Sequence, residues 1–169
     1  MTSTSSGVSI LDESRKQERE HVVELLTKAY WMEIETVMNY IAGSINPDGV
    51  RARQIAAALE QEIGEELGHA KLFGERIKEL YGVVPSSTQF SAEQGFMRPP
   101  EHQTDVIGLI RGVIEAESGA IEHYSRIVAE TEEIDPVTQD MVIDILHDEE
   151  GHRRLFEGFL REYEHTGGG

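Results

Sequence analysis

The stretch VTQDMVIDILHDEEGHRRLF at residues 137–156 combines the pattern of a buried helix with a dense group of ionisable side chains. Its apolar residues recur at steps of three and four, as they do on the core face of a bundle helix. Glu149 and His152 occupy two positions in the middle of that apolar series. A carboxylate and an imidazole on a core face need partners, because burying unpaired polar groups is costly.

The stretch EELGHAKLF at residues 65–73 repeats this Glu-x-x-His pattern, with Glu66 and His69 on the apolar face of another predicted helix. Two further helical patterns each carry one Glu in the middle of the apolar series and a Tyr seven positions later. These residues are Glu33 with Tyr40, and Glu117 with Tyr124. Glu66 follows Glu33 by 33 positions and Glu149 follows Glu117 by 32, so the sequence predicts two similar halves in a near-twofold arrangement.

Four long helices are expected, and typical helix breakers separate them. The helical patterns run at about 11–44, 49–81, 105–131 and 136–164. Turn residues NPDG at 46–49 separate the first two, while Thr104–Asp105 and Asp135–Pro136 are start signals for the third and fourth. The segment 82–103 carries three prolines and no sustained period. The sequence therefore predicts an all-α fold, an antiparallel four-helix bundle with a long crossover between helices two and three.

Composition restricts the class of protein. With 169 residues the chain fits one domain, expected at 10–164 between flexible tails at 1–9 and 165–169. Thirty-two acidic residues against fifteen Lys and Arg set a formal charge of -17, which opposes binding to nucleic acid. The chain has no cysteine, so a metal site must use nitrogen and oxygen ligands. No signal peptide and no membrane-spanning apolar run is recognisable, so we expect a cytoplasmic protein without a membrane partner.

Four carboxylates and two imidazoles in one core predict a site for two divalent cations. The six expected ligands are Glu33, Glu66, His69, Glu117, Glu149 and His152. Buried carboxylates repel one another unless countercharge is supplied, and no Lys or Arg falls at the same level of the four apolar series. The alternative is a set of interhelical ion pairs. Mixed imidazole and carboxylate ligands favour iron, with manganese or zinc as alternatives, over calcium or magnesium.

The Glu-x-x-His motif alone is weak evidence for a metal site, because it occurs at two further places in the chain. Glu18 with His21 and Glu162 with His165 fall near the ends of the bundle, and we interpret them as solvated helix ends. Four acidic residues lie beside the apolar series and are expected to face solvent. They are Glu35, Glu65, Glu115 and Glu150. Two interpretations of Glu62 are left open, a transient cation site and a solvated face, with the solvated face favoured.

Four segments together resemble the ferritin-like superfamily. They are MEIETVMNY at 32–40, EELGHAKLFGERI at 65–77, AESGAIEHY at 116–124 and the stretch at 137–156. The resemblance covers about residues 18–163 and is greatest to bacterioferritin and to Dps-like ferritins with a bacterioferritin-type site. Ferritin-like di-iron and di-manganese proteins take one Glu from each of two helices and Glu-x-x-His from each of the other two.

The resemblance implies a role for each of the six ligands. Glu33 and His69 would be the terminal ligands of one iron, Glu117 and His152 those of the other, with Glu66 and Glu149 bridging. Tyr40 matches a tyrosine of the family that hydrogen-bonds or supplies electrons beside the site. Tyr124 is its counterpart in the other half of the chain, and the alternative interpretation of both residues is that of ordinary core tyrosines. Two iron ions per subunit are therefore expected, with manganese as the alternative metal.

Two departures from the family affect the expected cofactor and assembly. The methionine that binds haem in bacterioferritin is replaced by Leu67, so we expect no haem. About 17 residues follow His152, too few for the fifth helix that ferritins use around their fourfold axes. A homo-oligomer of twelve subunits, as in Dps-like proteins, is therefore favoured over one of 24 subunits or a dimer.

The resemblance implies a di-iron ferroxidase, which oxidises Fe(II) with dioxygen or hydrogen peroxide for iron storage and detoxification. Two alternatives stay open. One is a non-storage peroxidase, catalase or oxygenase that uses two iron or manganese ions and acts as a dimer. The other is a structural four-helix bundle with a vestigial site. Assembly size distinguishes the first alternative from a ferroxidase, and protein that stays metal-free after exposure to iron would indicate the second.

Overall fold

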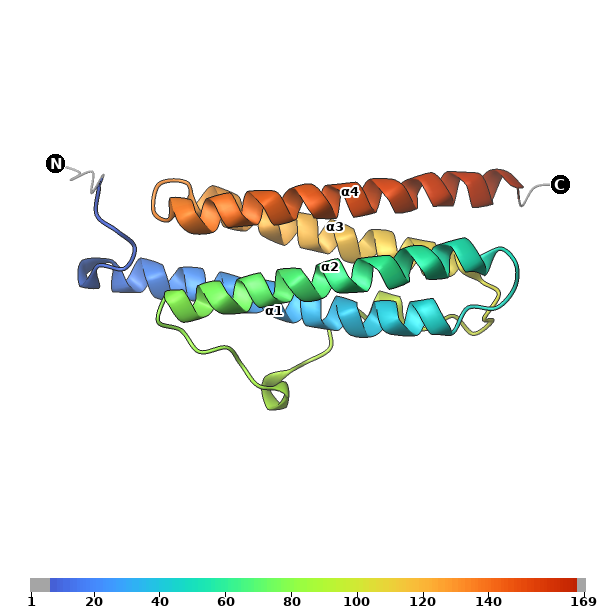
Figure 1. Cartoon of the computed structure of the whole chain (residues 1–169), viewed down its shortest axis with the longest axis horizontal. Helices are drawn as coiled ribbons and strands as arrows, with labels where there is room; N and C mark the ends of the chain where they lie inside the picture. Colours follow the sequence, from blue (N-terminus) through green and yellow to red (C-terminus); the bar gives the residue numbers. More distant parts are fainter. Residues whose placement is uncertain (1–6, 167–169) are drawn as a thin grey trace.

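The computed structural model describes residues 7–166, which form four long helices and no strand (Figure 1). The long helices are α1 (Lys16–Ile45), α2 (Ala52–Glu79), α3 (Val106–Thr131) and α4 (Pro136–Thr166), with short 3-10 helices η1 (Glu13–Arg15), η2 (Ser87–Gln89) and η3 (Gly95–Met97). The prediction of an all-α four-helix bundle is confirmed. Within the described residues, no helix has an apolar run that could cross a bilayer. The predicted tails lie largely outside the described residues, although α4 continues to Thr166.

Each half of the chain forms an antiparallel pair of helices. α1 packs mainly against α2, and α3 mainly against α4, while contacts between α1 and α3 join the two pairs. The crossover between α2 and α3 leaves one end of the bundle, runs along α1 and reaches the opposite end, where α3 begins (Figure 1). This connection gives the topology that the sequence predicts, with four helices around a common axis.

Capping side chains start α3 and α4 where the sequence predicts. The side chain of Asp105 accepts a hydrogen bond of 2.9 Å from the backbone N–H of Gly108 in the first turn of α3. Asp135 accepts one of 3.1 Å from the backbone N–H of Thr138, directly before Pro136 begins α4. Both caps satisfy donors that have no partner within the helix.

The first long helix begins later than the sequence pattern predicts. The expected start was near residue 11, whereas α1 begins at Lys16 and the short helix η1 precedes it. The reason is local, because the side chain of Asp12 accepts a hydrogen bond of 2.9 Å from the backbone N–H of Ser14. This cap closes a tight 3-10 turn before the α-helical ladder begins.

The apolar core consists of two clusters, one toward each end of the bundle. One cluster includes Val22, Leu26, Phe73, Ile77, Tyr124, Ile127, Val142 and Ile145. The other includes Tyr40, Ile55, Leu59, Ile110, Val113 and Phe156. Between them, the apolar series of all four helices are interrupted by buried polar residues. The core therefore has a polar layer at its middle, as the sequence pattern predicts.

A buried carboxylate fastens the crossover to α1. Glu35 accepts hydrogen bonds of 2.9 Å from the backbone N–H of Glu93 and 2.8 Å from that of Gln94. The side chain of Gln94 bonds in turn to Thr36 and to Asn39, each at 2.8 Å. The prediction that Glu35 faces solvent is wrong, because its residue surface is only 7% exposed. The crossover, which sequence periodicity on α1 cannot reveal, covers this part of the helix.

Candidate metal centre

The structure brings the six predicted ligand residues together in the polar layer. Each helix contributes, with Glu33 from α1, Glu66 and His69 from α2, Glu117 from α3, and Glu149 and His152 from α4. All six residues are buried, since Glu66 has no exposed surface and the most exposed, His152, keeps only 8%. One layer of the bundle therefore holds four carboxylates and two imidazoles on four different helices.

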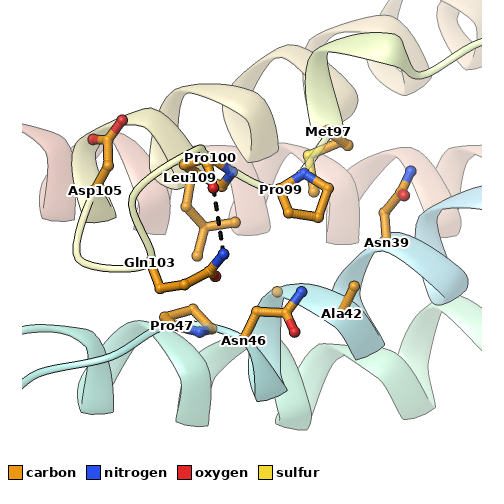
Figure 2. Close-up of a pocket in the computed structure, with 11 residues that line it drawn as sticks. Asn39, Ala42, Asn46, Pro47, Met97, Pro99, Pro100, Gln103, Asp105 and Leu109 are labelled. Atoms are coloured by element: carbon orange, nitrogen blue, oxygen red, sulfur yellow. Dashed lines mark hydrogen bonds between the residues drawn. The ribbon is translucent and has the colours of Figure 1, made fainter.

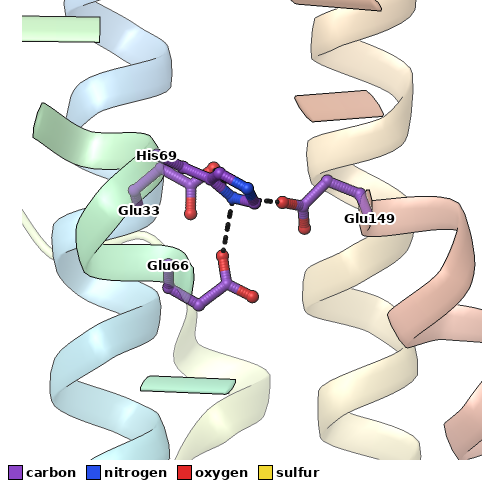
Figure 3. Close-up of side chains that lie close together, drawn as sticks. All are labelled: Glu33, Glu66, His69 and Glu149. Atoms are coloured by element: carbon purple, nitrogen blue, oxygen red, sulfur yellow. Dashed lines mark ion pairs between the residues drawn. The ribbon is translucent and has the colours of Figure 1, made fainter. Parts of the chain in front are cut away.

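The first group of possible ligands comprises Glu33, Glu66, His69 and Glu149 (Figure 3). One oxygen or nitrogen atom from each residue lies within 4.8 Å of those from the others. Nδ1 of His69 is 2.9 Å from a Glu149 oxygen, 3.5 Å from Glu66 and 3.8 Å from Glu33. Figure 3 shows the imidazole from α2 pointing across the core toward Glu149 on α4. Three helices thus direct ligand atoms to one point.

The second group comprises Glu62, Glu66, Glu117 and His152, again with ligand atoms within 4.8 Å of one another. Nδ1 of His152 lies 3.1 Å from Oε1 of Glu66. Glu66 belongs to both groups and offers one oxygen to each imidazole. This is the position that a bridging carboxylate requires. The bridging role assigned to Glu149 stays a prediction, because it belongs to the first group alone.

Glu62, whose place the sequence pattern left open, is a member of the centre. The favoured interpretation was a solvated face, but the residue is only 5% exposed and lies beside Glu66, Glu117 and His152. The available signal was its position four residues before Glu66, which puts both carboxylates on one face of α2. The angular width of the buried face could not be judged from the sequence of a single helix.

Two acidic residues hold the outer nitrogens of the imidazoles. Nε2 of His152 is 2.7 Å from Glu65, and Nε2 of His69 is 3.1 Å from Asp148. Each acid directly precedes a Glu of the centre and reaches across the contact between α2 and α4. Such carboxylates hold the proton of Nε2, so that Nδ1 is the nitrogen that faces the centre and can bind a cation. Glu65 was expected only to face solvent; its side chain is half-exposed and also makes this contact.

Two buried tyrosines connect the helix pairs at the centre. The Tyr40 hydroxyl donates a hydrogen bond to Glu117, and the Tyr124 hydroxyl donates one to Glu33. Neither tyrosine has exposed surface. Burial, followed by the charge of the carboxylate that each faces, raises the pKa of both phenols well above the usual value, so both stay protonated as donors. Tyr124 therefore has the same contact as Tyr40 in the other half of the chain.

Buried atoms without hydrogen-bond partners mark the same place. In residues 7–166, seven buried side-chain atoms lack a partner of suitable geometry, and all belong to the centre. They are Glu62 Oε2, both oxygens of Glu66, His69 Nδ1, Glu117 Oε2, Glu149 Oε1 and His152 Nδ1. Buried polar atoms are almost always bonded to protein, water or an ion. A mixed set of carboxylate oxygens and imidazole nitrogens fits two divalent transition-metal ions.

Protonation states of the metal-free centre follow from burial and crowding. Burial, together with neighbouring carboxylates, raises the pKa of Glu33 and Glu117 well above the usual value. Burial likewise raises the pKa of Glu62 to about 7. These carboxylates hold protons more tightly than exposed ones, because charged forms are disfavoured in a crowded, dry site.

By contrast, the pKa shifts of the two imidazoles and of Glu66 favour their charged forms. Burial opposes charge on His69 and His152, but their carboxylate partners outweigh it and raise the pKa of each imidazole to about 10. Burial also opposes charge on Glu66, yet contacts with the two imidazoles lower its pKa to about 2. In the metal-free protein, imidazolium ions therefore supply part of the countercharge that cations would supply when bound.

The other two Glu-x-x-His motifs lie away from the centre. His21 contacts Glu130 on the surface, and Glu18 pairs with Arg15. Glu162 and His165 are exposed near the end of α4. The structure therefore leaves all four residues at helix ends, as the sequence analysis expects. Glu115 and Glu150, which were also expected to face solvent, are both exposed.

A separate small cavity lies between the end of α1 and the start of α3 (Figure 2). Its lining includes Asn39, Asn46, Met97, Pro99 and Gln103. The volume of about 20 Å³ accommodates roughly one water molecule. This cavity has no cluster of titratable groups comparable with the polar layer, so the candidate centre stays at the middle of the bundle.

Comparison with known proteins agrees with the geometry. The ferritin-like domain family matches residues 23–166. A DNA protection during starvation protein of Pyrococcus furiosus is 31% identical over 83% of this chain and 77% of its own length. The bacterioferritin of Desulfovibrio desulfuricans is 27% identical over 85% of this chain and 76% of its own length. A crystal structure of Desulfovibrio desulfuricans bacterioferritin aligns with a TM-score of 0.77 over 91% of this chain and 86% of that chain.

A dodecameric thioferritin, the bacterioferritin-related protein of Bacteroides fragilis, is 25% identical and also aligns with a TM-score of 0.77, over 88% of this chain and 89% of that chain. The family match covers both helix pairs and every residue of the candidate centre. The chain therefore belongs to the ferritin-like family.

Proposed function

We propose that the protein is a ferroxidase that binds two Fe(II) ions per chain and oxidises them with dioxygen or hydrogen peroxide. The observation that carries this proposal is the sharing of Glu66 by two groups of buried ligand atoms. Each group also contains an imidazole whose inner nitrogen, although close to carboxylates, lacks a hydrogen bond of suitable geometry. Two cations with a common carboxylate would satisfy these atoms and neutralise the crowded acids.

Iron supplies the redox chemistry, because each Fe(II) gives up one electron on oxidation. Together, two electrons and two protons convert dioxygen to hydrogen peroxide, or hydrogen peroxide to water. The chain's own residues bind the two iron ions and orient the ligand side chains. Glu65 and Asp148 hold the outer imidazole nitrogens, so that the inner nitrogens face the carboxylates. Tyr40 and Tyr124 restrain Glu117 and Glu33. The two apolar clusters keep bulk water from the layer between them.

Storage of the ferric product requires a closed assembly of several subunits. The relatives support a homo-oligomer, since the Bacteroides fragilis protein is described as dodecameric. We therefore infer an assembly of twelve subunits in preference to 24 or two. The Pyrococcus furiosus relative is named for DNA protection. DNA binding is not part of the proposal for this chain, because its formal charge of -17 opposes contact with a polyanion.

The test is the rate of Fe(II) oxidation after anaerobic loading and exposure to oxygen. His152→Ala and Glu149→Ala are expected to abolish rapid oxidation, because each removes a ligand atom from the buried centre. His165→Ala is the matched control, since His165 belongs to the same motif on the same helix but is exposed. Circular dichroism checks that all variants stay helical. Wild-type rates in His152→Ala would overturn the assignment.

Particle mass and iron content on the same sample distinguish storage from simple redox catalysis. Many irons per chain inside a twelve-subunit particle would support a storage ferroxidase. Saturation at two irons per chain in a dimer would instead favour a non-storage oxidase or peroxidase. Wild-type protein that binds no iron would indicate a structural bundle with a vestigial site.

A further inference from the structure

The two halves of the chain correspond position by position around the candidate centre. The corresponding pairs are Glu33 and Glu117, Tyr40 and Tyr124, Glu65 and Asp148, Glu66 and Glu149, and His69 and His152. Each pair consists of identical residues, except that Glu65 and Asp148 differ by one methylene and make the same contact with an imidazole. If every position corresponded in this way, the two metal positions would have equivalent surroundings.

One buried position breaks this correspondence. Four residues before Glu66, α2 carries Glu62, whereas four residues before Glu149, α4 carries Ile145. Both residues are buried, with 5% and 1% of their surface exposed. Ile145 belongs to an apolar cluster, while Glu62 lies in the polar layer. One half of the centre therefore has a carboxylate where the other half has a hydrocarbon side chain.

Glu62 is directed at ligand atoms of one metal position only. It groups with Glu117, His152 and the shared Glu66, and it is absent from the group that contains His69. Its Oε2 atom is buried without a hydrogen-bond partner. Among the described residues, Glu62 has no ion pair with Lys or Arg. A buried carboxylate with a free oxygen beside three ligand residues is poised to accept a cation.

We propose that Glu62 is an additional cation ligand, which makes the Glu117/His152 metal position bind divalent cations more tightly than the Glu33/His69 position. This inference rests on the proposed two-metal site and concerns the order in which its positions fill. Cation affinity at oxygen-rich sites rises with the number of charged ligands. The first cation therefore occupies the Glu117/His152 position and the second occupies the Glu33/His69 position.

The test is anaerobic titration of metal-free protein with Co(II), followed by calorimetry and by the visible absorption of bound cobalt. The wild type is expected to bind two Co(II) per chain in two steps of unequal affinity. Glu62→Gln keeps the size of the side chain, and Glu62→Ile copies the residue of the other half. Either change is expected to weaken the tighter step by about tenfold or more, as losses around a metal site commonly do.

A matched control and two ligand variants locate the effect. Glu60→Gln alters an exposed carboxylate on the same helix and is expected to leave both steps unchanged. His152→Ala should remove the tighter step, and His69→Ala the weaker one. Two equal steps in the wild type, or unchanged steps in Glu62→Gln, would overturn the inference while leaving the two-metal site intact. Wild-type protein that binds no Co(II) and no Fe(II) would overturn the proposed function itself.

Discussion

Two clusters of buried charge in this bundle are stabilised in different ways. In the first, called the Arg76 cluster, the guanidinium of Arg76 donates to Asp135 at 2.8 Å and to Thr138 at 2.9 Å. Asp135 and Thr138 have no exposed surface, and Asp135 also accepts a hydrogen bond from the Thr138 hydroxyl. The second cluster is the candidate metal centre, where seven buried atoms lack a hydrogen-bond partner of suitable geometry.

The two clusters differ in the balance of charge among their own residues. The Arg76 cluster contains its own countercharge and enough donors for its carboxylate. The metal centre has carboxylates from five residues against two imidazoles, so its own groups cannot neutralise the negative charge when all the acids are ionised. We therefore expect cations to stabilise the centre, and we expect loss of a partner to damage the Arg76 cluster most.

The largest expected effect is stabilisation of the metal-free protein by cations. A ligand at a thousandfold excess over its dissociation constant stabilises the folded state by about 4 kcal/mol per site, so two sites would contribute about 8 kcal/mol. Thermal unfolding with and without Co(II) measures the shift, and a chelator should reverse it. A double variant, His69→Ala with His152→Ala, should show little shift. An equal shift in that variant would mean that the cation binds elsewhere.

Removal of the guanidinium in Arg76→Ala is expected to lower the free energy of unfolding by about 3 to 5 kcal/mol, because Asp135 would stay buried and unpaired. Arg153→Ala is the control, since Arg153 is a half-exposed residue paired with Glu157 one turn away. Its loss should cost about 0.5 kcal/mol or less. Urea unfolding of the metal-free proteins measures both. Similar losses in the two variants would contradict a special role for the Arg76 cluster.

Cation affinity is expected to increase with pH, with each displaced proton contributing about 1.4 kcal/mol per pH unit. The pKa of about 10 for His69 and His152 means that both imidazoles carry protons at neutral pH in the metal-free protein. A cation must displace the proton from Nδ1. The raised pKa also means that these ion pairs stabilise the metal-free fold fully below pH 6.5, and that this contribution is lost as the pH rises through about 10.

Calorimetric Co(II) titrations in buffers of different ionisation enthalpy would count the released protons. Release of protons and tighter binding at pH 8 than at pH 6 are expected. Binding that does not change over this range would contradict the assignment of protonated imidazoles to the metal-free centre.

A much smaller effect on stability than that of Arg76→Ala is expected for Glu117→Gln in the metal-free protein, a change of about 1 kcal/mol or less. Burial already raises the pKa of Glu117, so the substitution replaces a carboxyl group whose charge is disfavoured. The same variant should lose most of the stabilisation by Co(II), because a ligand oxygen is gone. Urea unfolding with and without cobalt measures both values. A large loss of stability without metal would show that Glu117 acts structurally, as Arg76 does.

Periodicity and local chemistry were sufficient for most of the fold. The apolar series located four helices, and the caps at Asp105 and Asp135 were correctly placed because capping depends on neighbours in the chain. The start of α1 was misplaced, since the 3-10 turn at Asp12 competes with an α-helical pattern that has no sharp beginning. Glu35 was misplaced because its cover, the crossover, has no periodic pattern that predicts its path.

The sequence alone determined the six residues that meet in the polar layer, because a fixed helical period and the matching depth of Glu33, Glu66, Glu117 and Glu149 put them at one level. Only the tertiary structure decided which residues support them. Asp148 reaches His69 and Glu65 reaches His152 across the contact of α2 with α4. Glu62 joins one group and Ile145 replaces it on the other side. These contacts depend on how helices are rotated against one another, which the periodicity of each helix taken separately does not contain.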